Sequence, residues 1–129
     1  MTSDARSAPR PRVLLADDYP AMVKAVSRLL TLDCDVVGSV ADGEALLEAA
    51  DRLQPDVIVL DVNLPKIHGL EACRRVKQAH PEVKIVVFTA NSDAEVRKHF
   101  LDSGASAYVS KTGGEDLLSA IKRVTGDPP

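Results

Sequence analysis

The chain has 129 residues and a formal net charge of −3, which fits a single domain with one hydrophobic core. Its lysines and arginines are scattered rather than clustered, which argues against nucleic-acid binding by this chain itself, and no apolar run approaches the length of a membrane span. Cys34 and Cys73 lie far apart without CxxC spacing, so we expect a reducing, cytoplasmic location rather than a disulfide framework.

Five apolar runs have the length of buried strands. Residues 1–11 are rich in Ser, Pro and Arg and predict a disordered leader, whereas residues 126–129 resemble a linker. Between them, residues 12–125 form the expected domain. Its strands are expected at residues 13–16, 36–40, 57–60, 85–88 and 107–109.

The segments between these runs have helical length and period. Their apolar residues recur at steps of three and four: Met22, Val23, Val26, Leu29 and Leu30; Ala45, Leu46, Ala49, Ala50 and Leu53; Ile67, Leu70, Cys73 and Val76; then residues 94–101 and 117–124. Ser92 with Glu95, and Thr112 with Glu115, have capping-box spacing. Gly104 suits the end of the fourth helix.

Alternating strands and helices predict one fold class. Continuously apolar strands with a helix after each indicate a parallel sheet covered on both faces, which is a doubly wound five-stranded α/β domain with five helices. In such domains ligands bind beyond the carboxyl ends of the strands. The residues that follow the strands are therefore the candidate site.

Carboxylates, a hydroxyl and an ammonium follow four of the five strands. Asp17 and Asp18 follow the first strand, Asp61 the third, Thr89 the fourth and Lys111 the fifth. Adjacent carboxylates repel each other unless a cation lies beside them, and Mg²⁺ prefers a few carboxylate oxygens. The pattern predicts a Mg²⁺ site in which Asp17 and Asp18 hold the metal and Asp61 is a nucleophile for a phosphoryl group.

Each of these residues also has an ordinary structural explanation. An Asp pair before Pro20 is a common start for a helix, and a lone Thr89 or Lys111 at a strand end is unremarkable by itself. Their coincidence at one edge of the sheet favours a site. The three histidines lack metal-ligand spacing, and the two cysteines suit small apolar positions, so we assign none of them a role.

The stretches LLADDYP, VIVLDVNLPKIHGLE, VVFTAN and GASAYVSK resemble a response-regulator receiver domain, and ADGEALLEAA and SGASAYVSKTGGEDLLSAI resemble its NarL type. The resemblance implies a flavodoxin-like sheet of order 2-1-3-4-5. It also implies that Asp61 accepts a phosphoryl group from a sensor histidine kinase or phosphotransfer protein. Mg²⁺ would bind Asp18, Asp61 and the backbone carbonyl of Asn63 directly, and Asp17 through water.

The remaining roles also follow from the resemblance. Lys111 would pair with the phosphoryl oxygens, Thr89 would move to donate to one of them, and Tyr108 would turn inward behind Thr89. Ala90 would leave the site open, and Asn91 would flank the path of an attacking water. One departure is Thr112, because many receivers have a proline directly after the lysine.

The resemblance implies a signalling phosphoacceptor rather than an enzyme with a separate substrate. Its output would be transcription through a DNA-binding domain outside this sequence, or protein contacts of a single-domain regulator, and both remain open. A homodimer through the first and fifth helices and a monomer also remain open. A haloacid-dehalogenase-like phosphatase would need an acid at Asn63, and a flavodoxin would need a hydroxyl-rich phosphate loop where DDYPAM stands.

Overall fold

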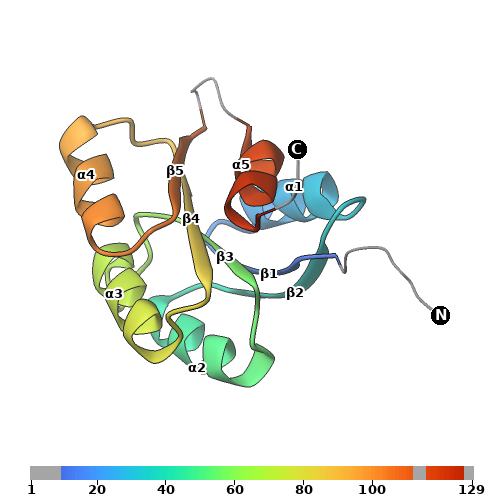
Figure 1. Cartoon of the computed structure of the whole chain (residues 1–129), viewed down its shortest axis with the longest axis horizontal. Helices are drawn as coiled ribbons and strands as arrows, with labels where there is room; N and C mark the ends of the chain where they lie inside the picture. The colour runs from blue at the N-terminus through green and yellow to red at the C-terminus, as the bar shows by residue number, and fades with distance from the viewer. Residues whose placement is uncertain (1–9, 112–115, 127–129) are drawn as a thin grey trace.

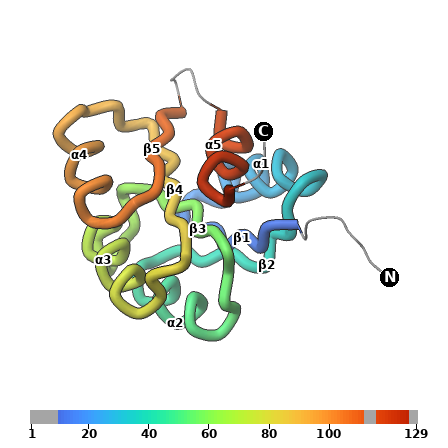
Figure 2. Tube along the Cα trace, viewed as in Figure 1, coloured from blue at the N-terminus to red at the C-terminus, as the bar shows by residue number. Residues whose placement is uncertain are grey.

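The structure is a computed structural model that describes residues 10–111 and 116–126. Five strands and five helices alternate along the chain (Figures 1 and 2). They are β1 (Arg12–Ala16), α1 (Pro20–Leu30), β2 (Asp35–Val40), α2 (Gly43–Leu53), β3 (Val57–Leu60), α3 (Gly69–Ala79), β4 (Lys84–Thr89), α4 (Ala94–Asp102), β5 (Ala107–Ser110) and α5 (Leu117–Val124).

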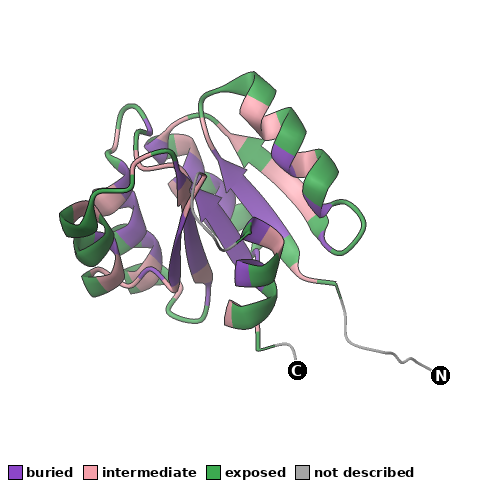
Figure 3. Ribbon diagram, turned by 90° about the horizontal axis from the view of Figure 1, so that it is seen from above, coloured by how far each residue is buried: buried purple, intermediate pink, exposed green. Residues whose placement is uncertain are grey.

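The strands form one parallel sheet of order β2-β1-β3-β4-β5. This confirms the predicted fold class and strand order. The strands begin and end within one residue or so of the expected bounds, because a parallel sheet buried on both faces needs the continuous apolar runs by which the strands were recognised. Figure 3 shows the buried strands in the centre and the exposed helical faces outside.

Alternate strand residues contribute to two hydrophobic clusters, one on each face of the sheet. Leu14, Ile58 and Ile85 pack with buried residues of α2, α3 and α4. Val13, Val57 and Val86 pack instead with buried residues of α1 and α5. Both cysteines are buried in these clusters, as expected of small apolar side chains. In the described part of the chain, no helix is long and apolar enough to cross a membrane.

The fourth helix is attached by few side chains. Phe100 is its buried residue, and Val96 and Leu101 are partly buried against the same cluster. Gly104 follows the helix with φ of 112°, and its N–H donates to the carbonyl of Leu101 at 3.2 Å, so its predicted place at the helix end is confirmed.

Two sequence expectations about helix starts were wrong in detail. The N-cap of α4 is Asp93 and not Ser92: its carboxylate accepts from the N–H groups of Glu95 at 2.8 Å and Val96 at 3.4 Å. The helix starts one residue later than the capping-box spacing implied. Ile67 lies before α3, in the β3–α3 loop, rather than on the helix. The predicted capping pair at Thr112 and Glu115 lies outside the described residues, and the N-cap of α5 is Asp116.

We predict that Asp93→Ala lowers the free energy of unfolding by about 1 kcal/mol, because two N–H groups at the start of α4 lose their acceptor. Ser92→Ala is the matched control and should change it by less than about 0.5 kcal/mol. Urea denaturation measures both variants. Equal losses in the two variants would restore Ser92 as the capping residue.

Candidate functional site

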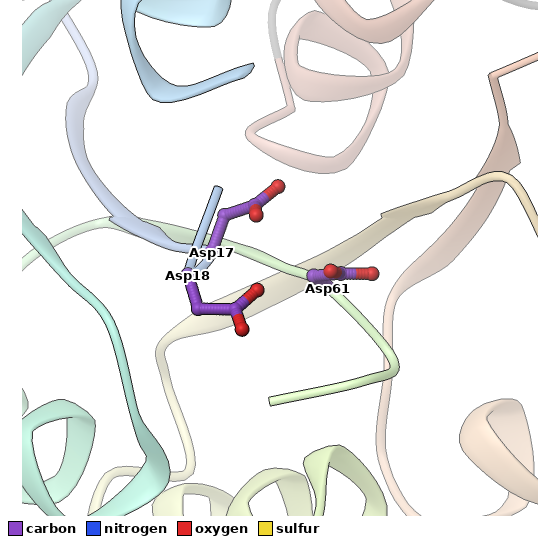
Figure 4. Close-up of side chains that lie close together, drawn as sticks. All are labelled: Asp17, Asp18 and Asp61. Carbon is purple, nitrogen blue, oxygen red and sulfur yellow. The ribbon is translucent and has the colours of Figure 1, made fainter. Parts of the chain in front are cut away.

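Three aspartates meet where β1 and β3 end. Asp17 and Asp18 follow Ala16, the last residue of β1. Asp61 follows Leu60, the last residue of β3, and Leu60 pairs with Ala16 in the sheet. The N–H of Asp61 donates to the carbonyl of Ala16 at 2.9 Å, so the ladder between the two strands continues to the first site residue. Figure 4 shows the three carboxylates beyond the ends of these strands.

The carboxylates are close enough to share one divalent cation. One oxygen from each of Asp17, Asp18 and Asp61 lies within 4.8 Å of the others. Octahedral Mg²⁺ has metal–oxygen distances of about 2.0–2.1 Å, so its opposing ligands lie about 4.2 Å apart. The upper limit of 4.8 Å on the separations of the three oxygens is close to this span, and carboxylate oxygens are the hard donors that Mg²⁺ prefers. The residues therefore fit this metal.

The pKa of Asp61 is raised above its ordinary value. Burial is the largest cause, and the negative charge of Asp17 adds to it, with a smaller contribution from Asp18. The ammonium of Lys111 and a hydrogen bond from the backbone of Asn63 act in the opposite direction. The sheet therefore holds Asp61 where its negative charge is costly and where a cation would relieve that cost.

Lys111 supplies a positive charge on the β5 side of the site. Its Nζ lies 3.9 Å from Oδ2 of Asp17 and 5.4 Å from the ring centroid of Phe88. Its backbone N–H donates to the carbonyl of Thr89 at 2.7 Å. Three carboxylates and one ammonium leave a net charge of −2, which a divalent cation would offset. Phe88 was not anticipated from the sequence, where it reads as one more apolar strand residue.

Thr89, Asn91 and Tyr108 are connected by hydrogen bonds. The buried Thr89 accepts at Oγ1 from the N–H of Asn91 at 3.2 Å, and Asn91 accepts at its carbonyl from the Tyr108 hydroxyl at 2.8 Å. The Tyr108 ring is buried and lies 6.1 Å from the ring of Phe100 on α4. The structure thus links the strand end that carries Thr89 to α4, the helix with the fewest buried residues.

The other expected site residues lie around this cluster. Ala90 is exposed directly after Thr89. Asn63 is exposed in the β3–α3 loop, two residues after Asp61. Thr112, the departure noted after Lys111, lies outside the described residues. Sequence reasoning missed that Asn91 contacts Tyr108 through its backbone carbonyl, since a main-chain acceptor has no residue signature.

We predict that Asp61→Asn raises the free energy of unfolding at pH 7 in EDTA. The raised pKa of Asp61 means that the wild type loses stability as pH rises from the ordinary aspartate value through the raised one, and the amide avoids this loss. The gain should vanish as pH falls below about 4. Denaturation across pH measures it, with the exposed Asp102→Asn as control. A gain independent of pH would contradict this explanation.

Comparison with known proteins agrees with this geometry. Residues 13–122 match the family model described as response regulator receiver domain. Over 116 residues the chain is 35% identical to the transcriptional regulatory protein DegU of Brevibacillus brevis, covering 88% of this chain and 49% of that protein. It is 37% identical over 112 residues to the nitrate/nitrite response regulator protein NarL of Escherichia coli K12, with 84% and 52% covered.

A crystal structure of a two-component response regulator of the LuxR family, from Aurantimonas sp. SI85-9A1, superposes with a TM-score of 0.86 at 28% identity, covering 91% of this chain and 86% of that one. The chain spans about half the length of the curated relatives it matches. By this match and by its fold, the chain belongs to the receiver domains of two-component response regulators.

Proposed function

We propose that Asp61 is the phosphoacceptor of this receiver domain and that it acts with Mg²⁺ bound at Asp17, Asp18 and Asp61. The observation that carries the proposal is the meeting of the three carboxylates with Lys111 and Thr89 at one edge of the sheet. Asp61, whose pKa is raised by burial and by the charge of Asp17, directly follows the central strand β3, which lies between β1 and β4.

In the proposed reaction a carboxylate oxygen of Asp61 attacks the phosphorus of a phosphohistidine. The new oxygen–phosphorus bond makes Asp61 an acyl phosphate. The bond from phosphorus to the imidazole nitrogen breaks, and the leaving imidazole takes up a proton. When bound, Mg²⁺ would offset the negative charge of the carboxylates and of the phosphoryl oxygens. Asp18, Asp61 and the carbonyl of Asn63 would hold it directly, with Asp17 bound through a water.

Lys111 and Thr89 would receive the transferred group. The Lys111 ammonium lies beside Asp17, and its charge acts to lower the pKa of Asp61, so it is placed to contact a phosphoryl oxygen on Asp61. Thr89 Oγ1 now accepts from the N–H of Asn91, and turning its O–H toward the phosphoryl group would change that contact. Because Tyr108 is bound to the same Asn91, the change would reach Phe100 and α4.

The partners follow from the same chemistry. We propose that a sensor histidine kinase or a phosphotransfer protein donates the phosphoryl group and that the domain acts in the cytoplasm. It would catalyse only its own phosphorylation and dephosphorylation. Its output would be control of transcription, as for the transcriptional regulatory protein DegU, with action as a stand-alone regulator as the alternative.

We predict that Asp61→Asn abolishes phosphorylation by acetyl phosphate in the presence of Mg²⁺, because an amide is a poor nucleophile and weakens the metal site. Intact-mass spectrometry measures the phosphorylated fraction. Asp102→Asn, an exposed aspartate at the end of α4, is the matched control and should be phosphorylated like the wild type. Phosphorylation of the Asp61→Asn protein would place the acceptor elsewhere.

We also propose that phosphorylation promotes self-association through α1 and α5. Leu29 on α1 and Leu32 just after it are exposed, at 50% and 85%, beside an ion pair between Asp33 and Lys122 of α5 at 3.7 Å. A two-fold interface would bring this patch against its own copy, with each aspartate near the other copy's lysine.

We predict that the protein with Mg²⁺ and beryllium fluoride, a mimic of the phosphoryl group, sediments as a dimer at micromolar concentration. Leu32→Glu should return it to a monomer, because the new charge would be desolvated in the interface. Leu101→Glu on α4 is a comparison at a partly buried apolar residue away from the patch. A wild type that stays monomeric throughout would exclude the dimer and leave Asp61 as phosphoacceptor.

A further inference from the structure

The loop that follows Asp61 is held at both of its ends. It comprises residues 61–68, between β3 and α3. Leu64 is buried in the cluster beneath α2, α3 and α4. At the far end, a Cβ on Gly69 would lie 2.8 Å from the carbonyl oxygen of Val62 and 3.0 Å from that of Asp61. The first residue of α3 therefore lies closely against the start of the loop, and Asn63 lies between Val62, which Gly69 approaches, and the buried Leu64.

A third contact comes from the start of α2. The N–H of Gly43 donates to the carbonyl of Pro65 at 3.1 Å. A Cβ on Gly43 would lie 2.5 Å from both the Cβ and the carbonyl oxygen of Ile67. Real side chains do not approach this closely, so glycine is required here by packing. The first turn of α2 and the loop that carries Asn63 are in direct backbone contact.

Lys66 adds an electrostatic contact at the same place. It has φ of 70°, a left-handed conformation that is uncommon for a residue with a side chain. Its Nζ lies 3.7 Å from Oδ2 of Asp42 and 3.8 Å from Oε1 of Glu44, the two residues on either side of Gly43. Asp42 is also the N-cap of α2, where it accepts from the N–H of Ala45 at 2.8 Å.

We propose that the first turn of α2, residues 42–44, positions the β3–α3 loop and thereby sets the affinity of the site for Mg²⁺, with Gly43 and Lys66 as positioning residues. The inference rests on the proposed function, since it takes the carbonyl of Asn63 as a metal ligand. Mg²⁺ demands near-ideal octahedral geometry, so a loop displaced by a fraction of an ångström would bind it less tightly. Neither Gly43 nor Lys66 is among the residues that would hold the metal.

When the charge of Lys66 is removed, a positioning role and a purely electrostatic role predict changes of opposite sign in the Mg²⁺ dissociation constant. Removing a cation from the loop beside a divalent metal site would, by electrostatics alone, strengthen Mg²⁺ binding. Loss of the contacts to Asp42 and Glu44 would instead loosen the loop and weaken Mg²⁺ binding. The direction of the change in the Mg²⁺ dissociation constant therefore separates the two roles without reference to activity.

The test is calorimetric titration of Mg²⁺ into protein freed of metal, with unfolding in EDTA measured in parallel. Gly43→Ala should raise the dissociation constant about tenfold, which corresponds to about 1.4 kcal/mol. Lys66→Met should raise it about threefold, and Lys66→Arg should restore it, because arginine keeps the positive charge. Glu48→Ala, exposed on the same helix, and Lys98→Met, exposed on α4, are the controls and should bind like the wild type.

Two failures are distinguishable. A wild type that does not bind Mg²⁺ overturns the proposed function together with this inference. A wild type that binds, while Gly43→Ala and Lys66→Met bind equally well or more tightly, overturns this inference alone. If Gly43→Ala does not fold, Lys66→Met decides, because its surface position leaves folding intact.

Discussion

Mutual repulsion of three carboxylates at the end of a buried sheet is the constraint around which the domain is arranged. Strands β1 and β3 are hydrogen-bonded neighbours, so their ends bring Asp17 and Asp61 together whether or not a cation is near. The pKa of Asp61 is raised mainly by burial, and repulsion from Asp17 raises it further. Two neighbouring groups partly offset this negative charge. They are the ammonium of Lys111, directly after β5, and a backbone hydrogen bond from Asn63 in the loop after β3.

The same arrangement explains how the proposed site would communicate with the surface. The contacts from Thr89 to Asn91, from Asn91 to Tyr108 and from Tyr108 to Phe100 all lie on the side of the sheet covered by α2, α3 and α4. The opposite cluster, under α1 and α5, includes neither aromatic residue. Packing on that second face supports the fold and the proposed contact surface, whereas the first face joins the site to α4.

The sequence predicted the fold and the positions of the site residues because both depend on strong, regular signals. Five apolar runs specify five buried strands, and the polar residues that follow four of these runs are carried to the same edge of the sheet. Helix starts were less certain, since Ser92 and Asp93 are both good caps and only the backbone decides between them.

Contacts made by the backbone were out of reach of sequence reasoning. Gly43 is a small residue at the start of a helix, and the residue type alone does not identify Ile67 as its neighbour. Asn91 accepts from the Tyr108 hydroxyl through its backbone carbonyl, a group that every residue has. Lys66 resembles any exposed lysine until its left-handed backbone and its two acidic neighbours are known.

The weak attachment of α4 has a consequence for the speed of the domain. Phe100 is the one buried side chain of this nine-residue helix, with Val96 and Leu101 partly buried beside it, so few van der Waals contacts must change for the helix to rotate or shift. A shift of one helix with few buried side chains is expected in the microsecond to millisecond range of collective motions rather than in the slower range of global unfolding. The time that the domain spends in a signalling state would then be governed by the chemical lifetime of the acyl phosphate, and not by the rate at which the protein changes shape.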